Sequence, residues 1–212
     1  MKVILAAAAT ICGRISPPGG SRLDRQRLEE LRDRTGASII GANTLRQENP
    51  EMRASGGVLP PERLRAVITR SGSIPVAGKN LFQHGPRPVV FTEKEAASSL
   101  QERLKNKARI VVLPQGPGGL SLKAALDFFS AEGVESLLIE GGARLNYAAL
   151  KEGLVDEIHL TLAPFVSGDR NSAALADGPM PLGDPFLALE LVSSEPLASG
   201  ELFLHYRVPK TT

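Results

Sequence analysis

The sequence predicts an α/β fold with a largely parallel sheet and antiparallel strands at its C-terminal edge. Short apolar runs alternate with amphipathic stretches of helical length through the first three-quarters of the chain, which is typical of strand–helix–strand units. In the last quarter, residues 157–163 and 202–208 alternate as strands do, with no helical pattern between them. Such strands are expected to pair antiparallel. We find no repeat and no strong linker, so the 212 residues are expected to form one domain, residues 1–212.

The expected strands are short apolar runs bounded by glycine, proline or polar residues. They fall at residues 3–9, 38–40, 64–68, 89–91, 110–113, 137–139, 157–163 and 202–208. Between residues 163 and 202, Pro179, Pro181 and Pro185 indicate an extended loop. Residues 55–61 also read as a loop.

Four helices are expected between these strands. Residues 25–34 carry apolar positions on one face, with Asp24 as the N-cap, and Thr92 opens a capping-box pattern before residues 94–104. Ser121 precedes an amphipathic stretch that ends at Gly133, a typical C-terminal glycine. A shorter helix over residues 143–151 follows Gly142.

Composition excludes several classes of protein. The net charge of +2, with bases scattered among acids, does not indicate a nucleic-acid partner. No apolar run approaches the roughly 20 residues of a membrane span, and the apolar opening reads as a buried strand and not as a secretory signal. The single cysteine, Cys12, fits a cytoplasmic protein and is expected to be a small buried side chain. His84, His159 and His205 are dispersed without metal-ligand spacing, so no metal site is expected.

The strongest local motif is Glu140-Gly141-Gly142, where an apolar strand ends in an acid and two glycines open a helix. Glycines let a phosphate approach the backbone, and the helix N-terminus attracts its charge. A tight turn that needs glycine explains the segment equally well. A second glycine-rich segment, residues 116–121, places Ser121 where a dinucleotide fingerprint needs glycine, and Pro117 lacks an amide donor, so a flexible connection is expected there.

Two further segments carry groups that suit phosphate. Thr44 follows a glycine turn, and Arg53 offers a planar fork of donors. At Thr69-Arg70-Ser71 a strand ends in two hydroxyls and a guanidinium, which could bind the 2′-phosphate of NADP. Each is also explained as a capping residue, a surface residue or a solvated turn.

In this order, the segments resemble the reductase domain of the bifunctional riboflavin-biosynthesis deaminase/reductase and its stand-alone archaeal and fungal relatives. The resemblance runs from Val3 to about Val208 and rests on four blocks in register: residues 9–15, 31–50, 139–142 and 155–168. It implies a dihydrofolate-reductase-like fold and a homodimer. It also implies that NADPH delivers hydride to C1′ of a ribosylaminopyrimidine 5′-phosphate.

The resemblance also implies roles for individual residues. The expected cofactor contacts include the Thr69-Arg70-Ser71 segment described above. The full set is Ala8, Thr44, Glu48, Thr69, Arg70, Ser71, Gly141, Gly142, Ala143, Arg144 and Leu145. The expected substrate contacts are Ser21, Arg32, Met52, Arg53 and Glu140. An acid near the sugar, Glu48 or Glu140, is the candidate catalytic residue that assists opening of the ribosyl ring.

The sequence departs from the family pattern mainly on the substrate side. Cys12 and Glu48 each stand where the family usually has Asp, and the spacing from Pro50 to Arg53 is short. A pterin, a dihydrofolate-like compound or another heterocycle therefore stays open as the substrate, as does a non-catalytic NADPH-binding module. The zinc deaminase signature is absent from the sequence. Whether the pyrimidine is reduced before or after deamination is not readable from the residues.

Overall fold

The structure is a computed structural model that describes residues 1–15, 21–184 and 186–210. It divides into two compact units, the first comprising Met1 and Glu29–Leu138 and the second Lys2–Leu28 and Ile139–Thr212. The divisions fall within helix α1 (Arg22–Asp33) and just before the last residue of strand β8 (Ser136–Ile139). Of the loop prolines, Pro185 lies outside the described residues.

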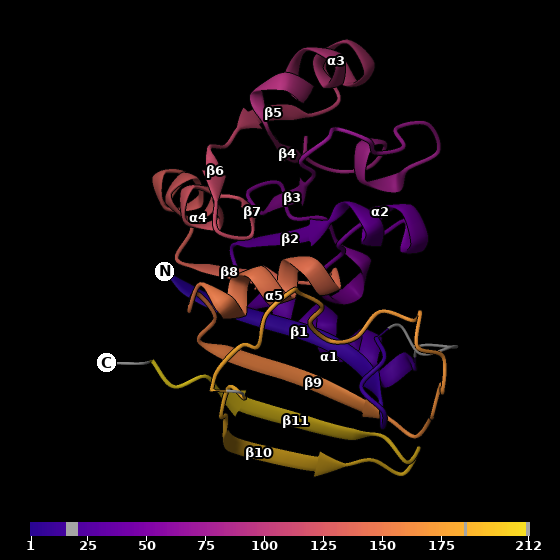
Figure 1. The fold of residues 1–212 in the computed structure, drawn as a ribbon. Coiled ribbons are helices and arrows are strands. Elements are labelled where there is room, and N and C mark those ends of the chain that lie inside the picture. Colours follow the sequence, from indigo (N-terminus) through magenta and orange to yellow (C-terminus); the bar gives the residue numbers. More distant parts are fainter. Residues whose placement is uncertain (16–20, 185, 211–212) are drawn as a thin grey trace. The chain divides into compact units, whose positions relative to one another are not determined.

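The first unit is built on a run of parallel strands (Figure 1). Strands β2 (Ala37–Gly41), β3 (Leu64–Ile68), β4 (Val89–Thr92) and β5 (Arg109–Val112) pair parallel in that order, and β8 lies beside β2. The connecting helices and short elements are α2 (Ala42–Glu48), η1 (Ser55–Gly57), η2 (Asn80–Phe82), α3 (Lys94–Leu104), β6 (Gln115–Gly116), β7 (Gly119–Leu120) and α4 (Leu122–Ala131).

The core of the first unit contains an aromatic cluster. The ring of Phe91 on β4 packs edge-on against Phe128 and Phe129 of α4, with centroids 5.3 and 5.5 Å apart. Phe91 and Phe129 are fully buried. Such pairs add to the free energy of area burial, so they fix α4 on the strands.

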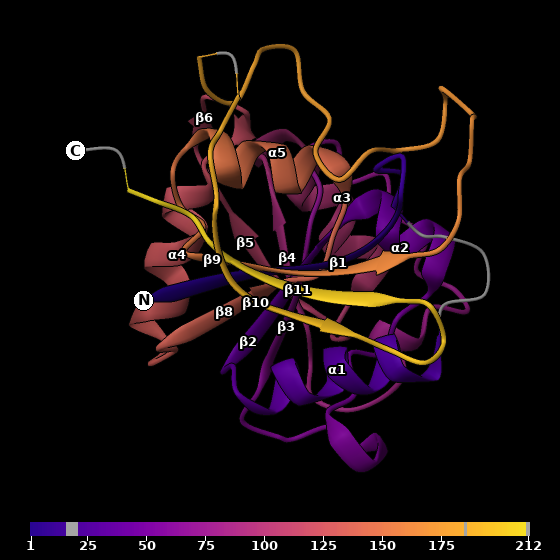
Figure 2. The same ribbon diagram turned by 90° about the horizontal axis from the view of Figure 1, so that it is seen from below.

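The second unit contains the antiparallel strands (Figures 1 and 2). Strand β1 (Lys2–Thr10) pairs parallel with β9 (Glu157–Ala163), which pairs antiparallel with β11 (Leu202–Arg207), and β10 (Glu190–Pro196) pairs antiparallel with β11 at the edge. Helix α5 (Ala143–Lys151) lies on one face of these strands and the start of α1 on the other.

Most expected elements are confirmed, including the antiparallel pairing of the two C-terminal strands. The expected bounds of residues 64–68, 143–151 and 157–163 match β3, α5 and β9. Ser121 caps α4 by accepting a hydrogen bond from the backbone N–H of Ala124 at 3.2 Å. Gly133, with φ of 82°, follows α4 as expected.

Four local predictions are wrong. Helix α1 begins earlier, because Ser21 Oγ, and not Asp24, accepts from the helix backbone, at the N–H of Asp24. Thr92 ends β4 and donates to the carbonyl of Arg70, so Glu93 takes the N-cap position of α3. The glycine-rich segment at 116–119 forms the turn of the β6–β7 hairpin instead of a flexible connection. Strand β10 was not expected.

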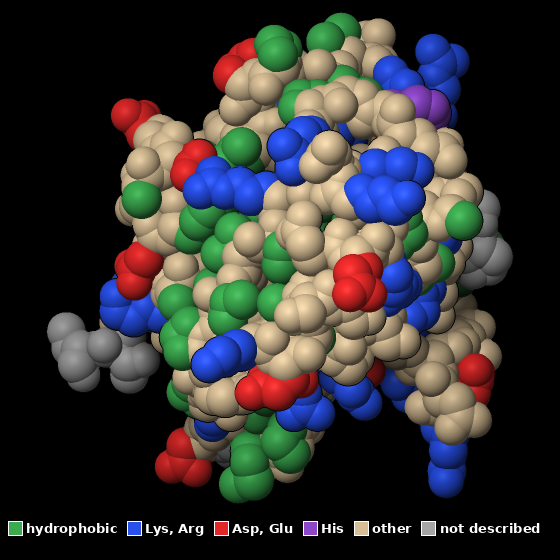
Figure 3. Space-filling model, turned by 90° about the horizontal axis from the view of Figure 1, so that it is seen from above, with side chains coloured by type: hydrophobic (Ala, Val, Ile, Leu, Met, Phe, Trp, Pro, Cys, Tyr) green, Lys and Arg blue, Asp and Glu red, His purple; other side chains and the backbone are tan. Residues whose placement is uncertain are grey.

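In the described part of the chain, no helix combines the length and apolarity needed to cross a membrane. On the face drawn in Figure 3, Lys and Arg side chains lie in separate groups among Asp, Glu and apolar side chains.

Candidate functional site

In the second unit, the glycine turn has a backbone that suits a phosphate. Gly141 and Gly142 have φ of 101° and 104°, a region that side-chain-bearing residues rarely adopt. A Cβ atom on Gly141 would meet nothing within 4 Å, so the backbone conformation, and not crowding, requires glycine there. Gly142 caps α5 without a side-chain hydrogen bond. The start of α5 therefore has no capping side chain in the way of an anion, and such a helix N-terminus suits a phosphate.

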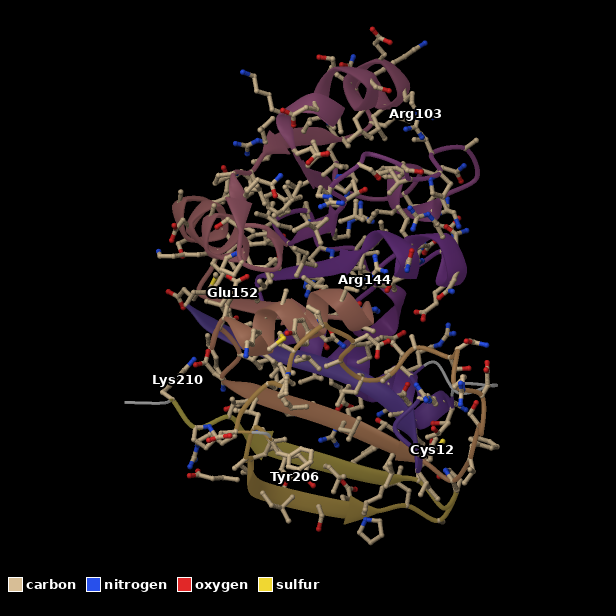
Figure 4. All side chains as sticks on the ribbon, viewed as in Figure 1. Cys12, Arg103, Arg144, Glu152, Tyr206 and Lys210 are labelled. Carbon is tan, nitrogen blue, oxygen red and sulfur yellow. The ribbon has the colours of Figure 1, made fainter. Side chains whose placement is uncertain are left out.

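Helix α5 is held in place behind this turn. Asn146 is fully buried and its Nδ2 donates to the carbonyl of Leu175 at 2.8 Å. The backbone N–H of Asp177 donates to the carbonyl of Ala143 at 3.1 Å. Of the predicted contacts in α5, Leu145 is buried in the core, whereas Arg144 is exposed at the start of the helix (Figure 4). Arg144 is the one placed to reach a ligand.

The carboxyl end of β1 turns through a tight loop next to predicted cofactor contact Ala8, which is half-buried. Thr10 organises this loop: its Oγ1 accepts from the backbone N–H of Arg14 at 3.0 Å and lies 3.2 Å from Sγ of Cys12. Cys12 is exposed (Figure 4), so its expected burial is wrong. Hydrogen bonding from Thr10 and from the backbone of Ser167 lowers the pKa of the Cys12 thiol to about 7.

In the first unit, two predicted cofactor segments follow neighbouring parallel strands. Gly41 at the end of β2 stands in register with Ile68 at the end of β3, so Thr44 of α2 and the Thr69-Arg70-Ser71 segment follow the same edge. Thr44 and Thr69 are buried, and Arg70 and Ser71 are exposed. Ligands of open α/β sheets bind at this edge, which agrees with a phosphate role for the two exposed side chains.

Glu48 and Glu140 sit in different surroundings. Glu48 is the last residue of α2 and is exposed, and Asn49 after it adopts the left-handed conformation with φ of 50°. Glu140 is half-buried directly before the glycine turn. Of the two carboxyl groups, Glu140 is the less exposed and lies beside the glycine turn.

The predicted substrate residues of the first unit form a connected cluster. Nη1 of the buried Arg32 donates to the carbonyl of Arg53 at 2.8 Å, and Nη1 of Arg53 donates to the carbonyl of Gly57 at 2.6 Å. Met52, which directly precedes Arg53 in the chain, is buried and has a φ of 60°. Arg32 therefore positions the backbone that carries Arg53, and Met52 anchors it in the core.

Two residues of this cluster were not predicted from the sequence. The carboxylate of Glu51 accepts a hydrogen bond from Nε of Arg53, and its other oxygen lies 2.6 Å from Nδ1 of His84. The hydrogen bond from Arg53 holds the pKa of Glu51 below its ordinary value. The two-residue spacing of Glu51 and Arg53 is a possible signal, but nothing in the sequence brings His84 to them across 33 positions.

The last predicted substrate residue, Ser21, has a structural task in the second unit. Its hydroxyl oxygen accepts from the backbone N–H of Asp24 at 2.9 Å, and its carbonyl accepts from Arg25. It therefore caps α1. A substrate contact through Ser21 remains a prediction.

Comparison with known proteins places these features in one family. The RibD C-terminal domain family matches residues 1–203 of the chain. The chain is 31% identical over 183 residues to a 2,5-diamino-6-ribosylamino-4(3H)-pyrimidinone 5′-phosphate reductase from Methanothermobacter thermautotrophicus, covering 83% of each protein. A reductase of the same name from Archaeoglobus fulgidus is 26% identical, with 83% of the chain and 86% of the relative covered.

Solved structures agree on the fold. A pyrimidine reductase-like protein from Corynebacterium diphtheriae superposes with a TM-score of 0.79 at 23% identity, covering 99% of this chain and 92% of that one. The riboflavin biosynthesis reductase Rib7 of Saccharomyces cerevisiae gives a TM-score of 0.74 at 16% identity, covering 98% and 90%. With the family match over nearly the whole sequence, the chain belongs to the RibD C-terminal domain family.

Proposed function

We propose that this chain is an NADPH-dependent reductase that converts a ribosylaminopyrimidine 5′-phosphate into the ribitylaminopyrimidine 5′-phosphate in riboflavin biosynthesis. The observation that carries the proposal is the 31% identity to the archaeal reductase, with 83% of both chains covered. The archaeal relatives are named for the diamino substrate, so we propose the diamino form, before deamination. The enzyme is proposed to be a cytoplasmic homodimer.

The residues that would hold NADPH are those whose backbone or charge suits phosphate. The backbone N–H groups of Gly142 and Ala143 at the start of α5 would donate hydrogen bonds to the pyrophosphate, with Arg144 adding a positive charge. Arg70 and Ser71, exposed after β3, would bind the 2′-phosphate that distinguishes NADPH from NADH. Ala8 of the second unit and Thr44, Thr69 and Glu48 of the first are the further cofactor contacts that we propose from the resemblance to the family.

The residues proposed for the substrate are those linked to Arg53. Its guanidinium would bind the 5′-phosphate, because a planar fork matches phosphate oxygens. Glu51 already accepts from Nε of this side chain, which fixes the orientation of the fork. Arg32 and Met52 hold the backbone of Arg53.

NADPH supplies the hydride when it is bound. The chain itself must open the ribosylamine ring to the imine, exclude water and provide a proton. Glu140 is the proposed acid: as the half-buried carboxyl next to the glycine turn, it can donate to the ring oxygen as the ring opens. Reduction at C1′ then gives the open-chain ribityl amine, with one hydride and one proton gained overall.

The test is a paired assay of NADPH oxidation with the diamino pyrimidine phosphate and its deaminated counterpart. Turnover with the diamino compound, at a kcat/KM above that for the deaminated one, supports the proposal. NADH in place of NADPH is the cofactor control, and it should give a higher KM. Tight NADPH binding without turnover on either compound would refute the reductase assignment.

A further inference from the structure

Three side chains of metal-ligand type meet on one face of the second unit. Glu157 and His159 stand two residues apart on β9, so their side chains share a face of the sheet. His205 on β11 is the direct antiparallel partner of His159. Phe203 lies two residues before His205 on the same face, and the guanidinium carbon of Arg27 sits 4.4 Å from its ring centroid. The three side chains therefore lie on the face covered by the start of α1 (Figure 2).

The distances between these side chains match a metal-binding site. Oε2 of Glu157 lies 3.2 Å from Nε2 of His205 and 3.6 Å from Nε2 of His159, and the potential ligand atoms of all three residues lie within 4.8 Å of one another. A tetrahedral zinc ion with bonds of about 2.0–2.1 Å separates neighbouring ligand atoms by about 3.4 Å. Both distances from the carboxylate oxygen are close to that value.

The hydrogen bonding of the cluster is incomplete. Nε2 of His205 is buried without a hydrogen bond, although the Glu157 oxygen is near, and Nδ1 of His159 is buried without one too. Buried polar atoms are normally satisfied by a partner, because leaving them unpaired costs free energy. A metal ion would satisfy the ring nitrogen of His205 by accepting its lone pair.

The two imidazoles need only a small adjustment to share an ion. Their rings stack with centroids 4.2 Å apart and planes 21° apart. The torsion that turns an imidazole about its Cβ–Cγ bond has a broad energy minimum. Rotation about it can therefore direct both Nε2 atoms at one ion at little cost in free energy.

The nearby cations leave one carboxylate oxygen available. Nζ of Lys2 lies 2.8 Å from Oε1 of Glu157, on the oxygen away from the histidines. This ion pair holds the carboxylate with Oε2 directed at the rings, as outer contacts do in metal sites. Arg27 is the other cation close to His159, and its guanidinium is engaged over the Phe203 ring.

We propose that Glu157, His159 and His205 bind a divalent transition-metal ion such as Zn²⁺, with water as the fourth ligand. Two imidazoles and a carboxylate are ligands that zinc prefers. Glu157 lies at the amino end of β9, whereas Ala163 at its other end pairs with Thr10, next to the Cys12 loop. The ion is therefore placed to link β9 with β11, and its role is structural and separate from the proposed reduction.

The test uses the tag-free, full-length protein and metal ions alone. Calorimetry with Zn²⁺ should show one ion per chain, and Co²⁺ should give the intense visible bands of a tetrahedral site. Glu157→Gln and His205→Asn should each weaken binding by more than about 10-fold, since even the outer contacts of metal sites contribute 10- to 100-fold. His84→Asn is the matched control, because Nδ1 of His84 also contacts a glutamate carboxylate but His84 is not part of the three-residue cluster. This variant should leave the Zn²⁺ affinity unchanged.

Ring-nitrogen NMR signals give a second readout that does not depend on the variants. Zn²⁺ should shift the signals of His159 and His205 and leave those of His84 in place. Circular dichroism shows whether each variant is folded. Absence of tetrahedral Co²⁺ bands, or equal Zn²⁺ affinity in the wild-type protein and folded Glu157→Gln, would overturn the proposal.

Discussion

The guanidinium of Arg53 donates from Nε to the carboxylate of Glu51, two residues before it in the chain. The same carboxylate contacts His84 through its other oxygen at 2.6 Å. The fork of Arg53 is thus oriented before any phosphate arrives, which lowers the entropy lost on binding. This pair is the structural basis of the proposed phosphate contact.

Replacing Arg53 with Lys is expected to raise KM for the pyrimidine phosphate by roughly 10-fold with little change in kcat. A lysine keeps the charge but loses the planar fork, so binding weakens equally in the ground and transition states. Steady-state kinetics measures both constants. Arg87→Lys is the control, because Nη2 of Arg87 donates to the carbonyl of Ala108 before β5; its KM should not change. An unchanged KM in Arg53→Lys would remove Arg53 from the substrate contacts.

Glu140→Gln is expected to lower kcat by about 100-fold or more, the usual contribution of a positioned general acid. Glu48→Gln should have the smaller effect, because Glu48 is exposed at the end of α2. Single-turnover rates separate this step from product release. Glu152→Gln is the control: Glu152 is partly buried at the far end of α5 (Figure 4). Full activity in both Glu140→Gln and Glu48→Gln would exclude these two side chains as the proton donor.

Gly141→Ala is expected to destabilise the protein by about 1–3 kcal/mol and to weaken NADPH binding. The cost is backbone strain at φ of 101°, since the added Cβ meets nothing within 4 Å. Gly153→Ala is a matched control: it too has open space and a positive φ, 65°, but lies after α5. It should lose about 1 kcal/mol of stability and keep its NADPH affinity. Denaturant unfolding and fluorescence titration measure the two effects, and equal NADPH affinity in both variants would contradict a phosphate site at the turn.

Alkylation of Cys12 by iodoacetamide is expected to reach half its maximal rate near pH 7. The thiolate is the reacting form, and hydrogen bonding from Thr10 lowers the thiol pKa to about 7 from its ordinary value of 9.0. The rate should therefore rise with pH through 7 and level off above it. Thr10→Val should move the midpoint upward. Cys12→Ser removes the single thiol and serves as the blank. A wild-type midpoint close to 9 would show that the loop does not stabilise the thiolate.

The regular elements of this fold could be predicted because their burial follows their sequence period. Four of the five residues of β3 are apolar, and α5 follows Gly142, the glycine at its N-cap position. Strand β10 was missed because all seven of its residues are exposed at the sheet edge, so no alternating apolar pattern marks it. The N-cap of α1 was misplaced because Ser21 and Asp24 are both good caps, and only the fold decides between them.

The sequence could not predict the two histidine contacts of the candidate sites, because each joins segments that are far apart in the chain. His159 and His205 are 46 positions apart, and they stack only because the β9–β11 register makes them direct partners. His84 reaches Glu51 across the loop that follows β3. In contrast, the glycine turn before α5 was predictable, because both its glycines are needed by local backbone conformation.

The most direct test of the central proposal is transfer of deuteride from 4-deuterated NADPH to the diamino pyrimidine phosphate, followed by NMR and mass spectrometry of the product. We predict a ribityl product with one deuterium at C1′, formed with either the pro-R or the pro-S label but not with both. A deuterium-free product, or NADPH oxidation without formation of the ribityl compound, would contradict the account.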